Sequence, residues 1–351
     1  MVNILDDVGG MQELDMDRML EYLRQFPENC RLALELAEKV PLDDIAARSF
    51  NAVVFVGIGG SAIGGAFVKD WLNEESRIPL AVSRGQSVPS FVDGETLVFA
   101  VSYSGNTLET RAACVEAFDK GATVVVLTSG GDIGRLAKER GLVLLRMPEG
   151  MKPRAAIPFQ FFMLAATLNR LGLIPDSWGE VDEAIRVLES LRDEMVPEVA
   201  SKSNPAKRLA EELLHRIPFI YGPKLLESVS YRFSTQLMEN AKTPAASWAF
   251  PEAFHNAVMT SEAHQEILDH LSLLIIRDPQ ASEETKRKVR RFEELFGPKV
   301  GALCNVEARG NGKLARMLSV VYWGDFVSTY LALLYGRDPG STDAIDEMKR
   351  V

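Results

Sequence analysis

Cysteine and histidine are scarce in this sequence. The three cysteines, Cys30, Cys114 and Cys304, are far apart, and an odd number of thiols cannot fully pair. They form no CxxC pair, so neither a zinc ribbon nor a disulfide framework is predicted, and a reducing compartment fits best. The four histidines include no pair at the i, i+4 spacing of a helical metal site. We therefore predict no metal site.

The chain also lacks the patterns that mark export or a membrane span. Its first ten residues, MVNILDDVGG, do not show the basic-then-apolar order of a signal peptide. Two apolar stretches, 155–174 and 320–335, are both interrupted by polar residues and fall short of a clean membrane helix. We expect two buried helices, no membrane contact and a cytoplasmic protein.

Positive charge is in the minority. Lysine and arginine number 39 against 49 aspartates and glutamates, a formal net charge of −10. Such an acidic protein has no electrostatic footprint for nucleic acid or anionic lipid. A small anionic substrate remains open, because a local pocket can be positive on a negative protein.

What is present is an ordinary globular composition with two similar halves. The 351 residues are 46% apolar and 25% charged, and at about 150 residues per domain they predict two domains. Strand and helix patterns alternate in each half, and the strands are continuous apolar runs such as AVVFV at 52–56. This pattern is typical of a parallel sheet covered on both faces, so the predicted class is α/β.

The predicted organisation has five parts. They are N-terminal helices at 1–45 with a break at Pro27, a first α/β domain at 46–152, connecting helices at 153–204, a second α/β domain at 205–310, and C-terminal helices at 311–351. The strands expected in the two domains are 52–56, 79–82, 96–101, 122–127 and 142–146, then 217–221, 271–276 and 300–306.

A glycine cluster, GIGGSA at 57–62, follows the first strand and opens a helix. Bared backbone N–H groups at a helix N-terminus form a site for an anion or a hydroxyl. The cluster also matches a dinucleotide fingerprint. However, the second strand does not end in the acidic residue that binds the ribose of NAD, and only Arg84 could support binding of NADP. A P-loop is excluded, because no Lys-Ser or Lys-Thr follows. A tight turn without a ligand stays open.

A second loop, SYSGNT at 102–107, again follows a strand and opens a helix. Ser102, Ser104, Thr107 and several N–H groups converge there. This arrangement suits a phosphate dianion held by hydroxyl groups rather than by lysine. Simple helix capping, with Glu109 in the first turn, is the alternative.

Together, the two loops resemble a sugar isomerase (SIS) domain, the fold of phosphosugar-binding proteins. The matched positions are Ser102, Ser104 and Thr107 in the phosphate loop, and Gly59, Gly60 and Ser61 in the sugar-contacting loop.

Four isolated side chains are further candidates. Arg154 stands at a proline-bounded helix start, Glu239 near a helix end, His255 in PEAFHN, and Lys349 near the C-terminus. Taken singly, each has an ordinary alternative. The arginine, the acid and the lysine are most often solvated, and the histidine is as often structural.

Taken together, these segments resemble the bifunctional phosphoglucose/phosphomannose isomerases over nearly the whole chain. The resemblance implies two SIS-type domains, a hexose 6-phosphate substrate, aldose–ketose isomerisation through a cis-enediol, no cofactor, and a homodimer in which His255 acts in its own or the other subunit's site. It also implies roles for single residues: Glu239 as the isomerisation base, His255 in ring opening, Arg154 beside the reacting carbons, Lys349 on the C-terminal helix, and Thr342 in accepting mannose 6-phosphate.

Two alternatives of other classes remain. A non-catalytic phosphosugar-binding or regulatory SIS protein would need the phosphate loop but not Glu239, His255 and Arg154 together. An NADP oxidoreductase would use the glycine cluster, but it has no use for the second loop.

Overall fold

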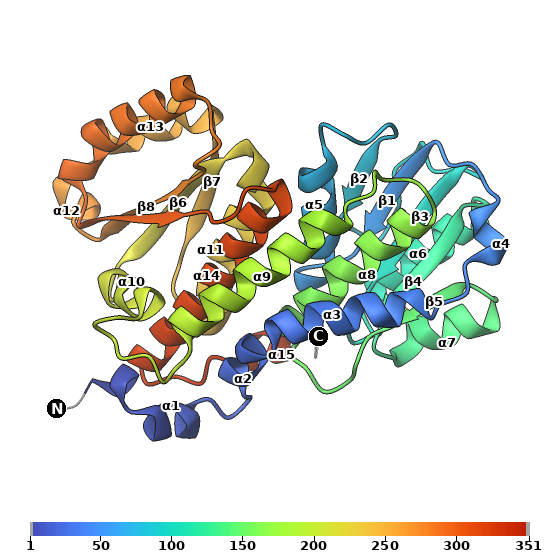
Figure 1. Ribbon diagram of the computed structural model, residues 1–351, viewed down its shortest axis with the longest axis horizontal. Helices are drawn as coiled ribbons and strands as arrows, with labels where there is room; N and C mark the ends of the chain where they lie inside the picture. The colour runs from blue at the N-terminus through green and yellow to red at the C-terminus, as the bar shows by residue number, and fades with distance from the viewer. Residues whose placement is uncertain (1–2, 349–351) are drawn as a thin grey trace. The chain divides into compact units, whose positions relative to one another are not determined.

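The computed structural model describes residues 3–348, which form two compact units (Figure 1). The five-stranded unit runs from Phe26 to Trp178, and the four-stranded unit combines the residues up to Gln25 with the chain from Gly179 onward. Each unit contains one parallel sheet with helices on both faces, which confirms the predicted α/β class.

The strands are β1 (Ala52–Val56), β2 (Leu80–Ser83), β3 (Thr96–Val101), β4 (Thr123–Thr128), β5 (Val143–Arg146), β6 (Ile217–Pro223), β7 (Ala246–Phe250), β8 (Leu271–Arg277) and β9 (Ala302–Glu307). The helices are α1 (Val8–Leu14), α2 (Met19–Arg24), α3 (Phe26–Glu38), α4 (Asp43–Ala46), α5 (Gly60–Leu72), α6 (Leu108–Asp119), α7 (Gly131–Glu139), α8 (Ile157–Arg170), α9 (Trp178–Met195), α10 (Pro205–Leu213), α11 (Glu227–Ala241), α12 (Gln265–Leu268), α13 (Glu283–Phe296), α14 (Lys313–Leu334) and α15 (Asp343–Met348).

The first sheet has the order β2-β1-β3-β4-β5, with every neighbouring pair parallel. Its two faces are covered by different helices. Val54 joins an aliphatic cluster with residues of α6 and α7, whereas Phe55 stacks on Phe99 at 5.5 Å and leaves no room for a side chain at Gly65 of α5. The strand order switches between β1 and β3, because the chain adds β2 on one side of β1 and then β3 on the other. Ligands of such sheets bind at the carboxyl ends of the strands at this switch point.

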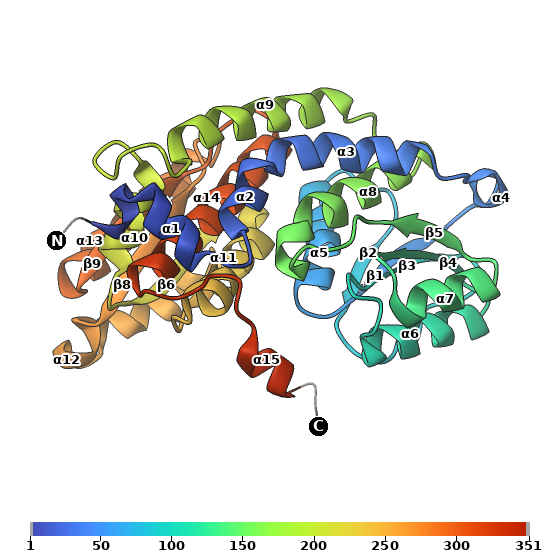
Figure 2. The same cartoon turned by 90° about the horizontal axis from the view of Figure 1, so that it is seen from below.

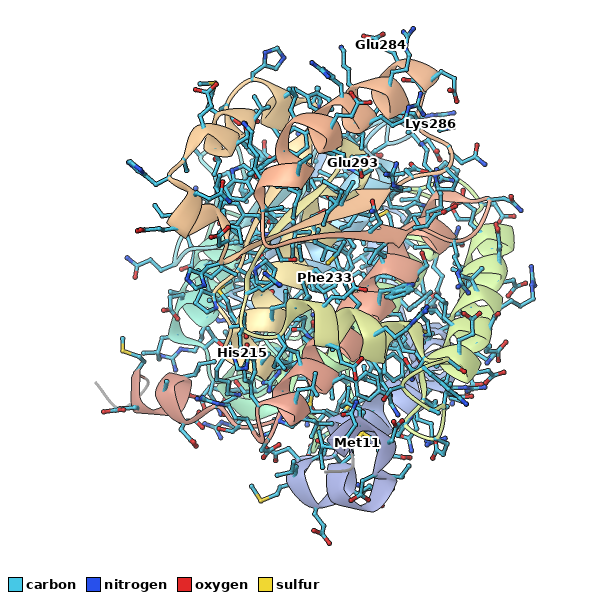
Figure 3. All side chains as sticks on the ribbon, turned by 90° about the vertical axis from the view of Figure 1, so that its left-hand side faces the viewer. Met11, His215, Phe233, Glu284, Lys286 and Glu293 are labelled. Carbon is cyan, nitrogen blue, oxygen red and sulfur yellow. The ribbon has the colours of Figure 1, made fainter. Side chains whose placement is uncertain are left out.

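The second sheet has the order β7-β6-β8-β9 and is also parallel. An aromatic cluster fills the face under α13, where the ring centroids of Tyr221 and Phe292 lie 4.9 Å apart. The outer side of α13 carries charges, and Figure 3 shows Glu284 and Lys286 pointing away from the sheet. This split between an apolar and a charged side is typical of a helix that covers a sheet.

Strand β7 was missed in the sequence analysis. Its five residues, ASWAF, contain no β-branched side chain, and three of them are only half-buried. Pairing with β6, from Phe219↔Ala246 to Pro223↔Phe250, makes this segment a strand. Sheet pairing of this kind is decided by tertiary contacts more than by local propensity.

The N-terminal helices also differ from expectation. A break at Pro27 was predicted within the N-terminal helices, but α2 and α3 are separated at Gln25 instead. Pro27 is the second residue of α3, where a missing N–H costs no helical hydrogen bond.

Helix α14 is buried along nearly all of its 22 residues and packs against α11, α10 and β9. Where it meets α11, a Cβ atom at Gly324 would lie 2.9 Å from the ring of Phe233, which Figure 3 labels. By length and composition alone α14 could cross a membrane, but 94% of its most apolar window is buried inside the described structure. The predicted buried helices at 155–174 and 320–335 correspond to α8 and α14.

Candidate functional site

The glycine cluster forms the sharp turn from β1 into α5. Gly59 has a φ of +55°, a conformation that suits glycine, and a Cβ at Gly60 would lie only 3.7 Å from the backbone of Arg154. The turn therefore brings α5 and the segment around Arg154 close together.

The second loop connects β3 to α6, and its hydroxyl groups form local hydrogen bonds within the loop. Ser102 is a buried residue, and its hydroxyl lies 3.0 Å from that of Thr107 and accepts from the N–H of Gly105 at 3.1 Å. The Ser104 hydroxyl accepts from the N–H of Asn106 at 3.3 Å and is exposed. Hydroxyls and N–H groups at the start of a twelve-residue helix make a cradle that fits a small dianion.

Backbone geometry makes glycine necessary within this cradle. Gly105 has a φ of +73°, and a side chain there would collide with the carbonyl group of Gly130. The N–H of Ile133 donates to Gly105 O at 2.9 Å, and the N–H of Asp132 donates to the Asn106 side chain at 3.1 Å. The first residues of α7 thus hold the backbone of the cradle in place through these two hydrogen bonds.

The two loops are directly connected. The N–H of Tyr103 donates to the Ser61 hydroxyl at 3.2 Å, and Ser61 is itself buried. The Tyr103 hydroxyl donates to Pro148 O at 3.0 Å and accepts from the N–H of Met151 at 2.7 Å. Sequence reasoning missed Tyr103 as a support, because these contacts join segments more than 40 residues apart.

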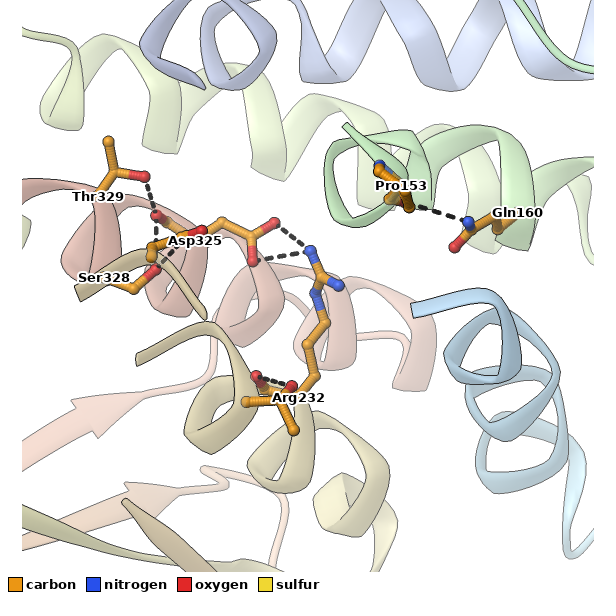
Figure 4. Close-up of polar contacts among 8 residues, drawn as sticks. Pro153, Gln160, Arg232, Asp325, Ser328 and Thr329 are labelled. Atoms are coloured by element: carbon orange, nitrogen blue, oxygen red, sulfur yellow. Dashed lines mark hydrogen bonds and ion pairs between the residues drawn. The ribbon is translucent and has the colours of Figure 1, made fainter. Parts of the chain in front are cut away.

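Arg154 is held in the same unit by a 3-10 turn, η2 (Pro153–Ala156), ahead of α8. Its side chain is 2% exposed, so the ordinary alternative of a solvated arginine does not hold. The Gln160 side chain donates to Pro153 O at 3.1 Å (Figure 4), and α5 approaches the backbone of Gln160 so closely that only glycine fits at Gly64. Gln160, missed from sequence, anchors the residue before Arg154.

The remaining candidates belong to the four-stranded unit. Glu239 is half-buried in the last turn of α11, a helix that is tied to α14 by Asn240, whose amide donates to the Ser328 hydroxyl at 2.9 Å. Lys242 directly follows α11, and its ammonium group contacts the carbonyl oxygens of both Glu239 and Ser341. This contact brings the segment that precedes Thr342 to the end of the helix that carries Glu239.

Thr342 lies just before α15, and its hydroxyl donates to the Asp346 carboxylate at 2.9 Å. His255 follows β7 in a short 3-10 turn, where its N–H donates to Glu252 O at 2.9 Å. Its side chain is exposed, unlike that of a buried structural histidine. Lys349 lies outside the described residues.

The cysteines offer no nucleophile in this arrangement. All three are buried free thiols, and burial raises the pKa of Cys114 to about 11 and that of Cys304 to about 12. Across residues 3–348, no group of three His, Cys, Asp or Glu side chains is placed to hold a metal ion.

Comparisons with known proteins cover both parts of the chain. Residues 48–170 match the SIS domain, and residues 202–351 match the bacterial phospho-glucose isomerase C-terminal SIS domain. A bifunctional phosphoglucose/phosphomannose isomerase from Caldicellulosiruptor bescii is 36% identical over 335 residues, which cover 94% of this chain and 98% of the relative. A protein of the same name from Aquifex aeolicus is 33% identical over 304 residues, which cover 86% and 90%.

The fold has solved counterparts as well. The crystal structure of a glucose-6-phosphate isomerase like protein from Thermus thermophilus matches with a TM-score of 0.63 at 22% identity, covering 96% of this chain and 97% of that one. At this identity, the likeness shows the fold alone.

Proposed function

The chain belongs to the bifunctional phosphoglucose/phosphomannose isomerase family, and from this membership we propose that it interconverts glucose 6-phosphate and mannose 6-phosphate with fructose 6-phosphate. The observation that carries the proposal is the relationship to curated isomerases over most of the chain. The hydroxyl cradle at the start of α6 supports it, because a 6-phosphate group carries the charge that such a cradle binds.

The phosphate, bound by Ser102, Ser104 and Thr107, would hold the substrate in register. Because it stays unchanged during the reaction, its binding energy is available to orient the reacting carbons. Gly59, Gly60 and Ser61 would contact the sugar from the neighbouring loop, whose connection to the phosphate loop through Ser61 and Tyr103 favours a shared role.

Proton transfer is assigned to Glu239. In the aldose-to-ketose direction its carboxylate removes the proton from C2, which gives a cis-enediolate, and then returns a proton to C1 while the proton of the C2 hydroxyl passes to the C1 oxygen. Negative charge develops on the oxygens in between, and the Arg154 guanidinium would stabilise it. Loss of one such group typically costs about 10² to 10³ in rate.

Ring opening needs a separate acid–base group, because hexose phosphates in water are mostly cyclic. His255 would move a proton between the ring oxygen and the hydroxyl group, a task suited to a side chain that titrates near neutral pH. Lys349 would act at the same oxygens, and Thr342 would contribute to accepting the mannose epimer. We also propose a homodimer, a cytoplasmic location, and a reaction without metal or cofactor.

The test is an isomerase assay on the purified full-length protein, with the product detected in a separate second step. Fructose 6-phosphate should form from both aldose phosphates after exhaustive treatment with EDTA and without added nicotinamide cofactor. Binding of sugar phosphate without turnover would instead indicate the non-catalytic alternative. Loss of activity with EDTA and recovery with zinc would contradict the metal-free mechanism.

A further inference from the structure

Lys242 occupies a backbone position that usually belongs to glycine. It directly follows α11 with a φ of +55° and a ψ of +31°, the left-handed conformation that commonly ends a helix. A residue with a Cβ is disfavoured in this conformation. Arg18 and His215 adopt a similar φ, so the contacts of the Lys242 side chain, rather than its backbone, have to show whether it has a role.

Its contribution is visible in three hydrogen bonds. The Lys242 ammonium donates to Glu239 O at 2.7 Å, to Asn240 O at 3.2 Å and to Ser341 O at 2.9 Å. Two of these acceptors are carbonyls of the last turn of α11, at the negative end of the helix dipole. The third comes from a segment 99 positions further along the chain.

That third contact fastens the C-terminal segment to α11. Ser341 directly precedes Thr342 and the short helix α15, and Figure 2 shows the chain passing beside α11 before α15 begins. The segment has its own local bonds, such as Asp346 N to Thr342 O at 2.9 Å, but all residues of α15 are exposed. A helix of six exposed residues has little stability of its own, so its location depends on how its first residues are held.

We propose that Lys242 is a positioning residue that holds the segment 341–348 at the end of the helix carrying Glu239. This inference rests on the proposed function, in which Glu239 is the base and Thr342 lies in the substrate site. Lys242 itself transfers no proton and need not touch the substrate. Lys242 couples the position of the base to that of the C-terminal segment. It does so by binding two main-chain carbonyls at the end of α11 and the main-chain carbonyl of Ser341.

Three variants of the full-length protein separate this role from simple helix capping. Lys242→Met removes the ammonium, Lys242→Gly removes it and also relieves the left-handed strain, and Lys242→Arg keeps a cation. The first two should speed backbone amide exchange within 342–348 by about tenfold or more, since the local opening becomes easier. They should lower kcat more than they raise KM, because the phosphate cradle is untouched.

The glycine variant provides the sharpest contrast. A purely structural cap would be preserved or improved by glycine, and its unfolding midpoint and kcat should then match those of the wild type. We expect the midpoint to be preserved but kcat to fall, with partial recovery in Lys242→Arg. Lys224→Met is the matched control, because Lys224 is an exposed lysine just before the same helix and pairs with Glu227. Both amide exchange and kcat should be unchanged in it.

Two results would overturn the proposal: wild-type exchange in 342–348 for Lys242→Met, or faster exchange with an unchanged kcat in both Lys242→Met and Lys242→Gly. If the wild-type protein fails to isomerise either sugar phosphate, the proposed function falls. The amide exchange then still decides whether Lys242 holds the segment.

Discussion

Arg232 of α11 and Asp325 of α14 form a buried ion pair in which one guanidinium nitrogen donates to both carboxylate oxygens, at 2.9 and 2.8 Å (Figure 4). Their side chains are 3% and 4% exposed. The Asp325 carbonyl also accepts from the hydroxyls of Ser328 and Thr329, and Ser328 in turn accepts from Asn240. These buried polar contacts fix how α11, which carries Glu239, is aligned against α14.

The ion pair predicts a strongly non-additive pair of mutations. Asp325→Ala leaves a buried guanidinium without its carboxylate and should reduce the free energy of unfolding by about 3–5 kcal/mol. The double variant Arg232→Met with Asp325→Leu removes both charges and should be more stable than Asp325→Ala alone. Urea unfolding followed by circular dichroism measures both. Simple additivity of the single variants Arg232→Met and Asp325→Leu in the double variant would show that the two charges do not depend on each other.

The phosphate cradle predicts an effect on substrate affinity. Ser104→Ala combined with Thr107→Ala removes two hydroxyls and should raise KM for both sugar phosphates far more than it lowers kcat, because the ground state and the transition state share these contacts. Initial rates over a range of substrate concentrations separate the two parameters. An unchanged KM would remove this loop from the binding site.

The proposed base predicts an effect on turnover. Glu239→Gln keeps the size and hydrogen-bonding capacity of the side chain but removes the proton acceptor, so kcat should fall by about 10² or more with little change in KM. Deuterium from solvent should enter C2 during wild-type turnover, as NMR of the recovered aldose phosphate would show. Near-normal exchange in the variant would rule out Glu239, and the exposed Glu252 would become the candidate.

His255→Ala should have a different signature, since ring opening precedes the enediol step. The variant should lose more activity toward cyclic substrate than toward an open-chain analogue. Parallel kinetics with both compounds provide the test. An equal loss on both would assign His255 to a later step or to structure.

Asp6 predicts a pH-dependent contribution to stability. Its carboxylate accepts from the backbone N–H of Ser201 at 2.7 Å and from the Ser201 hydroxyl at 3.0 Å, and these bonds hold its pKa below the ordinary value of 3.8. Because the folded pKa is the lower one, the stabilisation is present above the unfolded pKa and is lost as pH falls through the folded value. Asp6→Asn should therefore lower the urea midpoint more at pH 6 than at about pH 3.

A matched variant separates the two hydrogen bonds to Asp6. Ser201→Ala removes the hydroxyl but keeps the stronger backbone bond, so its pH-dependent effect should be smaller than that of Asp6→Asn. An equal loss for Asp6→Asn at both pH values would show that the carboxylate charge does not contribute.

Several features were predictable because their causes are local. Continuous apolar runs such as AVVFV are typical of buried parallel strands, and β1, β3 and β4, which are buried along their whole length, follow from this pattern. Glycine at 59 and 105 is required by the backbone turn itself. The two loops that follow β1 and β3 were therefore evident as candidate anion sites before any contact between them was known.

Tertiary structure decided the rest, because the deciding contacts join residues far apart in the chain. β7 becomes a strand through pairing with β6, and Arg154 is buried because its segment packs against glycine-lined α5. The link from Lys242 to Ser341 spans 99 positions, and neither residue differs locally from a solvated polar side chain. Hydrophobic periodicity encodes which face of an element is buried. It carries no information about which distant polar group will meet which carbonyl, so the support of this candidate site could be seen only in the folded chain.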